Sequence, residues 1–174
     1  MLNKIEQGDC PEQLIGKHSY ILSADTIVVL DGSILGKPKD EQDAMRMLKL
    51  LQGKTHQVYT GICLLQAGRG IAEAKKASGV KYQSILLDNQ ATAMVGHTVS
   101  HVTFRQMSDD EIRAYIHTGI PMDKAGSYGV QGLGAIFIDK IDGDFYSIMG
   151  LPLALLYTML EDANIYSILD TNAK

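Results

Sequence analysis

The spacing of apolar residues along the chain predicts short strands in some segments and helices in others. Residues 20–30 contain the continuous apolar run IVVL at positions 27–30. Such a run is typical of a strand covered on both faces, although periodicity alone does not exclude a buried helix. The dipeptide DG at 31–32 is a turn signal, and residues 33–36 have the composition of a short return strand. This segment therefore predicts a tight hairpin.

Three helices are predicted from their starts and from apolar residues at helical spacing. Asp40 is a suitable N-cap for a helix that ends at Gly53, and Ser108 with Glu111 has the capping-box pattern. Pro152 can occupy the first turn of a last helix. The apolar positions behind these starts are Ala44, Met47, Leu48 and Leu51, then Ile112, Tyr115 and Ile116, then Leu153, Leu156, Tyr157 and Leu160.

The other segments complete an α/β pattern. We expect an exposed excursion with a short helix over residues 66–79, and further strands over 58–65, 80–87, 95–104, 134–141 and 145–149, the last two paired around the DG turn at 142–143. Strands that alternate with helices, with hairpins among them, predict an α/β fold with a mixed, twisted sheet flanked by helices. The sequence indicates one domain over residues 1–174.

Composition and charge exclude several classes of protein. The chain has 174 residues, 45% hydrophobic and 21% charged, which is ordinary for a globular domain. A net charge of −4 with intermixed signs argues against a nucleic-acid groove. Cys10 and Cys63 lack metal or redox spacing, and the longest apolar run, 151–160, is too short for a bilayer. With a polar start unlike a secretory signal, the chain is predicted to be cytoplasmic, without nucleic-acid or membrane partners.

Three loops contain residues that could perform chemistry. Asp25 is set in an apolar run, where a carboxylate is costly unless it is hydrogen-bonded or faces a cation. Lys37 precedes Pro38, whose ring fixes the backbone beside the lysine. The glycine-rich segment DKAGSYGVQG at 123–132 permits close approach of a ligand, and Gln131 offers both a donor and an acceptor to a base edge. Taken singly, such an acid more often caps a turn, a lone lysine is usually solvated, and a glycine-rich segment can be a plain turn.

Together with two further motifs, these loops resemble a known family. The segments SADTIVVLDGSILGKP, GKTHQVYTG at 53–61, DKAGSYGVQG and GLPL at 150–153 occur in the order and rough spacing of the Maf family, over roughly residues 21–161. The resemblance implies a fold like that of inosine triphosphate pyrophosphatases. It also implies hydrolysis of nucleoside triphosphates to monophosphate and pyrophosphate. The YGVQG segment is similar to the branch that acts on dTTP and UTP rather than the 7-methyl-GTP branch.

The resemblance also implies roles for particular residues. Asp25 would accept a proton from the water that attacks the α-phosphate, and would hold a divalent metal, for which magnesium is expected. Thr26 and Gln131 match the specificity positions, where a pyrimidine edge could be recognised. Lys37 and Lys124 would neutralise phosphate charge, in keeping with phosphoryl-transfer chemistry. The family resemblance further implies a homodimer.

One departure from the family pattern concerns the start of the chain. The family has a Ser-x-Ser-Pro-Arg-Arg loop and a metal-binding glutamate upstream of the SADT segment, and none of the residues before Ser23 matches them. We therefore expect an N-terminally truncated domain with weak or undetectable hydrolysis. Two alternatives stay open: a catalytically impaired nucleotide-binding or regulatory paralogue or fragment, and a structural domain that binds no nucleotide.

Two histidines imitate a metal pair. His97 and His101 have helical spacing, but the valines and threonines around them favour a strand. Four strand steps separate side chains by roughly 13 Å, which is too far to share one metal ion. We expect both to be structural or surface residues.

Overall fold

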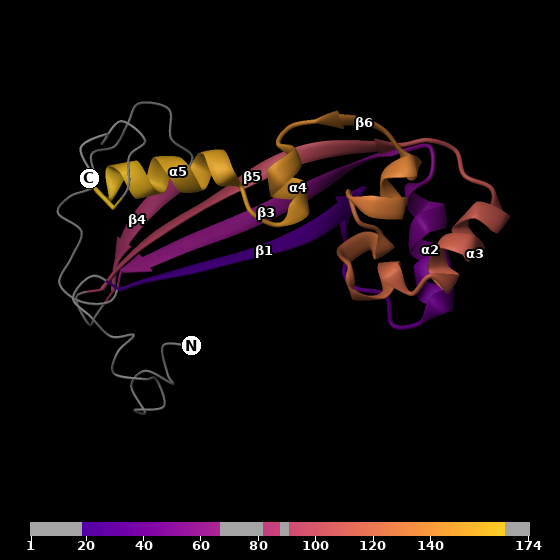
Figure 1. The fold of residues 1–174 in the computed structure, drawn as a ribbon, viewed down its shortest axis with the longest axis horizontal. Coiled ribbons are helices and arrows are strands. Elements are labelled where there is room, and N and C mark those ends of the chain that lie inside the picture. Colours follow the sequence, from indigo (N-terminus) through magenta and orange to yellow (C-terminus); the bar gives the residue numbers. More distant parts are fainter. Residues whose placement is uncertain (1–18, 67–81, 88–90, 166–174) are drawn as a thin grey trace. The chain divides into compact units, whose positions relative to one another are not determined.

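The computed structural model describes residues 19–66, 82–87 and 91–165 (Figure 1). Within these residues, six strands form one sheet in the order β2-β1-β3-β5-β4, with β6 paired to β5. The strands are β1 (Tyr20–Leu30), β2 (Ser33–Leu35), β3 (Thr55–Gln66), β4 (Tyr82–Leu86), β5 (Thr92–Phe104) and β6 (Ile138–Asp142). The excursion predicted over residues 66–79 lies, beyond residue 66, outside the described residues.

Within the described residues, four α-helices and three 3₁₀ helices accompany the sheet. They are α2 (Glu41–Leu51), α3 (Asp109–His117), α4 (Phe145–Met149), α5 (Leu153–Asp162), η2 (Ile120–Asp123), η3 (Ala125–Ser127) and η4 (Gly132–Phe137). The predicted α/β class, with a sheet flanked by helices, is confirmed. Among the described residues, no helix has the length and apolar character needed to cross a membrane.

Local chemistry explains the first hairpin and the starts of α2 and α3. β1 and β2 pair antiparallel with Val28 opposite Leu35, so the predicted hairpin is confirmed. The Asp40 side chain accepts a hydrogen bond from the backbone N–H of Asp43 at 2.8 Å. At α3, Ser108 and Glu111 exchange the two bonds of a capping box. Each cap satisfies N–H groups that have no partner inside the helix.

Two compact units divide the chain, and each is described by itself. The first, here called the site unit, comprises residues 24–61 and 97–153. Its core joins β1, β3 and β5 to the apolar faces of α2 and α3, which lie side by side in Figure 1. Core residues from these elements include Val28, Leu30, Leu48, Leu51, Val58, Phe104, Ile112 and Ile116. Burial of these side chains holds the strand ends and loops that carry the candidate chemistry.

The second unit comprises the described parts of residues 1–23, 62–96 and 154–174. In it, β4 and β5 pair antiparallel. The Tyr82 hydroxyl donates a hydrogen bond to the Asp162 carboxylate at 2.5 Å, which fixes the end of α5 to β4. Cys63 is a free thiol, as predicted, whereas Cys10 lies outside the described residues.

The prediction of paired strands around residues 142–143 was wrong. Strand β6 pairs with β5 instead, and residues 145–149 form α4. The reason is Asp144, whose carboxylate accepts the backbone N–H of Tyr146 at 2.9 Å and the hydroxyl of Ser147 at 2.6 Å. Such local bonds compete with a strand ladder. Phe145 and Tyr146 looked like strand residues but are 40% and 53% exposed.

The segment before β6 also differs from the prediction. Residues 134–137 belong to η4 and not to a strand, and the strand starts only at Ile138. The N-terminal side of η4 is constrained by Gly134, where an added Cβ atom would lie 2.3 Å from the carbonyl oxygen of Gly129. Close packing of two backbone segments, which only glycine allows, replaces strand pairing here.

Candidate functional site

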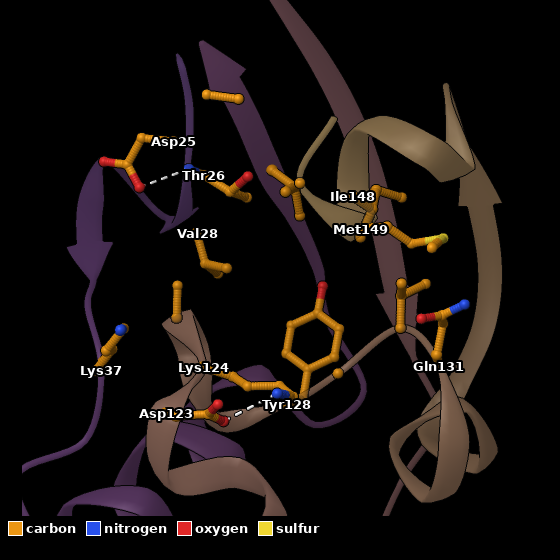
Figure 2. Close-up of a pocket in the computed structure, with 16 residues that line it drawn as sticks. Asp25, Thr26, Val28, Lys37, Asp123, Lys124, Tyr128, Gln131, Ile148 and Met149 are labelled. Atoms are coloured by element: carbon orange, nitrogen blue, oxygen red, sulfur yellow. Dashed lines mark hydrogen bonds and ion pairs between the residues drawn. The ribbon is translucent and has the colours of Figure 1, made fainter. Parts of the chain in front are cut away.

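A cavity of about 410 Å³ in the site unit contains the candidate chemistry (Figure 2). Its walls come from β1, the loop after β2, residues 123–131 and the end of α4. All five site residues predicted from the sequence line it: Asp25, Thr26, Lys37, Lys124 and Gln131. In the view of Figure 2, Asp25 and Lys37 lie on one side and Gln131 lies on the other, with Tyr128 between them.

Asp25 is exposed to solvent, although the apolar run around it suggested a buried carboxylate. It lies on β1, and its Oδ1 atom accepts a hydrogen bond from the backbone N–H of Thr26 at 2.9 Å. Among the described residues, the second oxygen has no hydrogen-bond partner. One oxygen is therefore oriented by the backbone, and the other is available to a water molecule or a cation.

Lys37 and Lys124 lie on two loops that are joined by a backbone hydrogen bond. The N–H of Gly126 donates to the carbonyl oxygen of Gly36 at 3.0 Å. An added Cβ atom at Gly126, where φ is +69°, would lie 3.1 Å from Val28 Cγ1. Glycine is required at this position both for the left-handed backbone and for the close approach to β1. This contact between the two loops places both lysines on the wall of one cavity.

Asp123 is a member of the site that the sequence analysis missed. Its carboxylate accepts a hydrogen bond from the Lys124 ammonium at 2.9 Å. This bond and the charge of Lys124, with a smaller contribution from Lys37, hold the pKa of the Asp123 carboxyl below its ordinary value. The only available signal was its position in the segment DKAGSYGVQG, directly before Lys124. Asp123 brings a negative charge to the predicted phosphate side of the pocket.

Tyr115 of α3 supports the glycine-rich loop that carries Gln131. Its hydroxyl oxygen accepts the backbone N–H of Gly129 at 3.2 Å, and it would lie 2.8 Å from a Cβ atom added at Gly134. The Gln131 side chain is exposed and, within the part of the chain that the structure describes, makes no hydrogen bond. The loop backbone is thus held while the amide group of Gln131 stays available to a ligand.

A buried histidine lies behind the pocket and was not assigned from the sequence. His56 is 1% exposed, and its Nε2 atom is 2.8 Å from the hydroxyl oxygen of Tyr128. The ring meets Phe104 and Tyr128 edge to face. Burial lowers the pKa of His56 to about 4, so the ring is neutral near pH 7. His56 lies two residues before buried Val58, on the same face of β3, and this spacing was the one signal that it points inward.

On the described part of the pocket wall, a metal ion would need ligands from a substrate as well as from the protein. Among the described residues, no group of three or more histidine, cysteine or acidic side chains could hold a metal ion. Asp25 and Asp123 are the two carboxylates on the pocket wall. Magnesium is commonly held by one or two carboxylates together with substrate phosphates. The exposed oxygen of Asp25 fits that arrangement, whereas Asp123 is already paired with Lys124.

An α/β domain whose pocket combines a carboxylate, two lysines and a glycine-rich loop is typical of proteins that bind a small phosphorylated ligand. The family described as Maf-like protein matches residues 3–163, and the chain belongs to this family. The resemblance to the Maf family found in the four motifs is therefore confirmed.

Relatives from distant organisms share much of the chain. The dTTP/UTP pyrophosphatase of Clostridium botulinum (strain Eklund 17B / Type B) is 45% identical over 152 residues, which cover 87% of this chain and 70% of that protein. The proteins of the same name from Acholeplasma laidlawii and Thermococcus onnurineus are 47% and 42% identical, over 85% and 81% of this chain. The matches cover 68% and 64% of those two proteins. The chain thus spans about two thirds of their length.

Proposed function

We propose that this chain hydrolyses dTTP and UTP to the nucleoside monophosphate and pyrophosphate. The observation that carries the proposal is the convergence of Asp25, Lys37, Lys124 and Gln131 on one cavity. The names of the relatives, dTTP/UTP pyrophosphatase, indicate the substrates. A carboxylate that can accept a proton, cations for phosphate oxygens and an amide for a base edge are the groups that this reaction needs.

Asp25 is the proposed general base. Its Oδ1 atom is held by the Thr26 N–H, so the carboxylate has a defined direction, and the second oxygen takes the proton of the attacking water. The water oxygen forms a bond to the α-phosphorus while the bond from that phosphorus to the bridging oxygen breaks. Pyrophosphate leaves with the electron pair of the broken bond.

Lys37 and Lys124 are the proposed phosphate-binding residues. A triphosphate is strongly anionic near neutral pH, and fixed cations stabilise the charge that moves to the leaving group. Lys124 is paired with Asp123 in the structure described, so its ammonium would exchange that carboxylate for a phosphate oxygen. Lys37 has no ion pair among the described residues and would contribute its charge directly.

Asp25 is also the proposed protein ligand of a divalent metal, for which magnesium is expected. When bound, such an ion neutralises phosphate charge and favours attack on phosphorus. Because the described residues provide no group of three or more potential ligands, substrate oxygens and water would supply the remaining coordination.

Thr26 and Gln131 are the proposed specificity residues. Thr26 lies on β1 beside Asp25, and Gln131 projects from the glycine-rich loop, so both reach the same cavity from different elements. Their hydroxyl and amide groups carry no charge for phosphate but can pair with the edge of a base.

A homodimer in the cytoplasm is the proposed state of the protein. The family resemblance supports the dimer, and the free Cys63 thiol supports a reducing compartment. Light scattering of the purified chain would measure its mass in solution. A molar mass near that of one chain at micromolar concentration would contradict the dimer.

Incubation with UTP, dTTP, GTP and ATP in the presence of magnesium tests the proposed reaction. We expect UMP or dTMP and pyrophosphate in equal amounts, with the purine nucleotides hydrolysed more slowly. Binding without pyrophosphate release, seen as a nucleotide-dependent rise in melting temperature, would favour the catalytically impaired paralogue or fragment. Absence of both effects would favour a domain that binds no nucleotide.

A further inference from the structure

Three hydrogen-bonding groups connect the pocket wall to α4. Thr26 Oγ1 lies 2.9 Å from Thr60 Oγ1, and Thr60 Oγ1 lies 2.6 Å from the carbonyl oxygen of Ser147. A hydroxyl group has one proton, and a carbonyl oxygen can only accept a hydrogen bond. The Thr60 hydroxyl therefore donates its hydrogen bond to the Ser147 carbonyl oxygen, and the Thr60 oxygen must accept a hydrogen bond from the Thr26 hydroxyl.

The direction of this series of hydrogen bonds is fixed because the Ser147 carbonyl belongs to a helix that other hydrogen bonds hold in place. The Asp144 carboxylate accepts the Tyr146 N–H and the Ser147 hydroxyl, and the Asp144 N–H donates to Ser100 Oγ at 3.0 Å. Thr60 is 0% exposed and Ser147 is 1% exposed. In a buried place the reverse direction would set the Thr60 lone pairs against the carbonyl oxygen, which is unfavourable.

The fixed direction has a consequence for Thr26, which lines the pocket. Because the Thr26 hydroxyl donates its hydrogen bond to Thr60, its oxygen offers only a lone pair to a ligand. Gln131 differs, because rotation of its amide exchanges the donor and the acceptor. Of the two residues proposed to face the base, Thr26 therefore has the defined polarity.

We propose that Thr60 is a positioning residue that makes Thr26 a hydrogen-bond acceptor and thereby selects pyrimidine bases whose ring N3 atom carries a proton. Uracil and thymine have this N3–H group, whereas the N3 atom of cytosine is itself an acceptor. The inference rests on the proposed function, since it takes Thr26 to face the base. A site that accepts an N–H group discriminates strongly against an analogue without it, because polar atoms are left unpaired.

Comparison of UTP with CTP tests this inference, because the two differ only in the base. We would measure kcat/KM for both in the wild type, Thr60→Val and Thr60→Ser. Valine has the shape of threonine but cannot accept a hydrogen bond. The Thr26 hydroxyl then becomes free to rotate and to donate a hydrogen bond to the N3 atom of cytosine. We expect the preference for UTP to fall by about tenfold in Thr60→Val. Serine restores the acceptor, so Thr60→Ser should keep the wild-type preference.

The valine variant retains the partner of the α4 carbonyl. The backbone N–H of Gly150 also donates to the Ser147 carbonyl oxygen, at 2.9 Å, so that oxygen is not left unpaired. An unchanged UTP-to-CTP ratio in Thr60→Val would overturn the inference. An equal loss of preference in Thr60→Ser and Thr60→Val would overturn it as well.

A second measurement needs no variant and separates this inference from the proposed function. In the wild type, UTP methylated at N3 should be at least about tenfold poorer than UTP, since its N3 atom cannot donate. Equal kcat/KM for the methylated and unmethylated nucleotide, or for CTP and UTP, would overturn the inference. If UTP is not hydrolysed at all, the proposed function fails, and the preference is then measured as the affinity for UMP against CMP, where equal affinities would overturn it.

Discussion

The Lys124 ammonium donates a hydrogen bond to the Asp123 carboxylate at 2.9 Å, so one of the two lysines on the pocket wall already has a counter-ion. The Lys124 side chain is 38% exposed and that of Asp123 is 75% exposed, which makes the pair a surface ion pair. Such pairs contribute at most about 1 kcal/mol. A polyphosphate can therefore displace Asp123 at small cost, and removal of the carboxylate should make anion binding easier.

Asp123→Asn should bind pyrophosphate more tightly than the wild type by up to about fivefold in the presence of EDTA, where no metal ion contributes. The affinity is measured by calorimetry at low ionic strength. Asp31→Asn is the matched control, because Asp31 pairs with Lys54 at 3.5 Å and does not line the pocket. An equal gain in the two variants would show a general charge effect and would contradict the local exchange.

Gln131→Ala should reduce base selectivity more than phosphate binding. The amide carries no charge for phosphate, but its loss leaves a polar edge of the base unpaired. We expect the ratio of kcat/KM for UTP over ATP to fall by about tenfold, while the inhibition constant of pyrophosphate stays the same. Gln57→Ala, outside the pocket lining, serves as the control. A constant UTP-to-ATP ratio would remove Gln131 from base recognition.

Gly134→Ala should destabilise the loop that carries Gln131. An added Cβ atom would lie 2.3 Å from the Gly129 carbonyl oxygen, which is backbone and cannot move aside alone. We expect the free energy of unfolding to fall by about 1–3 kcal/mol, as for other overpacked positions. Gly36→Ala is the matched control, because its Cβ atom would have no neighbour within 4 Å. Equal urea midpoints for the two variants would contradict this packing argument.

His56 should make the protein sensitive to mild acid. Its pKa in the folded state is about 4, below the ordinary value of 6.5, so the unfolded chain binds more protons between these values. The stability present above pH 6.5 is therefore lost as the pH falls toward 4. Between pH 7.5 and pH 5 the loss attributable to this group is about 2 kcal/mol.

His56→Gln removes the titrating ring and keeps a polar group near Tyr128, so its free energy of unfolding should depend less on pH over that interval. Urea unfolding at both pH values measures the difference. His101→Gln is the control, because His101 is exposed on β5. Identical pH dependence in the wild type and His56→Gln would contradict the assignment of a neutral, buried histidine.

Features determined by neighbouring residues were predictable from the sequence, and features that need distant partners were not. The caps at Asp40 and Ser108 depend on residues three positions away, so their sequence patterns were sufficient. His56 and Tyr128 are 72 positions apart, and no local pattern indicated that their side chains would pair. Helix α4 departs from this division, because its Asp144 cap is local, at Tyr146 and Ser147, and was still missed in a segment whose Phe and Tyr residues favour a strand.

Most of the candidate site was likewise predictable from local motifs. The five residues predicted from the motifs do line one cavity, because each motif places its residue at a strand end or in a loop of the site unit. The exposure of Asp25 was not predicted, since an apolar sequence does not show which face of a strand is covered. Asp123 departs from this division: its partner Lys124 is the next residue, but adjacency alone does not show that the ammonium group turns back to the carboxylate.

Hydrolysis of UTP in ¹⁸O-labelled water by the wild type and by Asp25→Asn tests the central claim most directly. Asparagine can still accept the Thr26 N–H, so the variant should fold, but it cannot take the proton of the attacking water. The account predicts one ¹⁸O atom in UMP and none in pyrophosphate, with a rate about 10²–10⁴-fold lower in Asp25→Asn. Label in the pyrophosphate, release of orthophosphate with UDP, or near-normal turnover by the variant would contradict it.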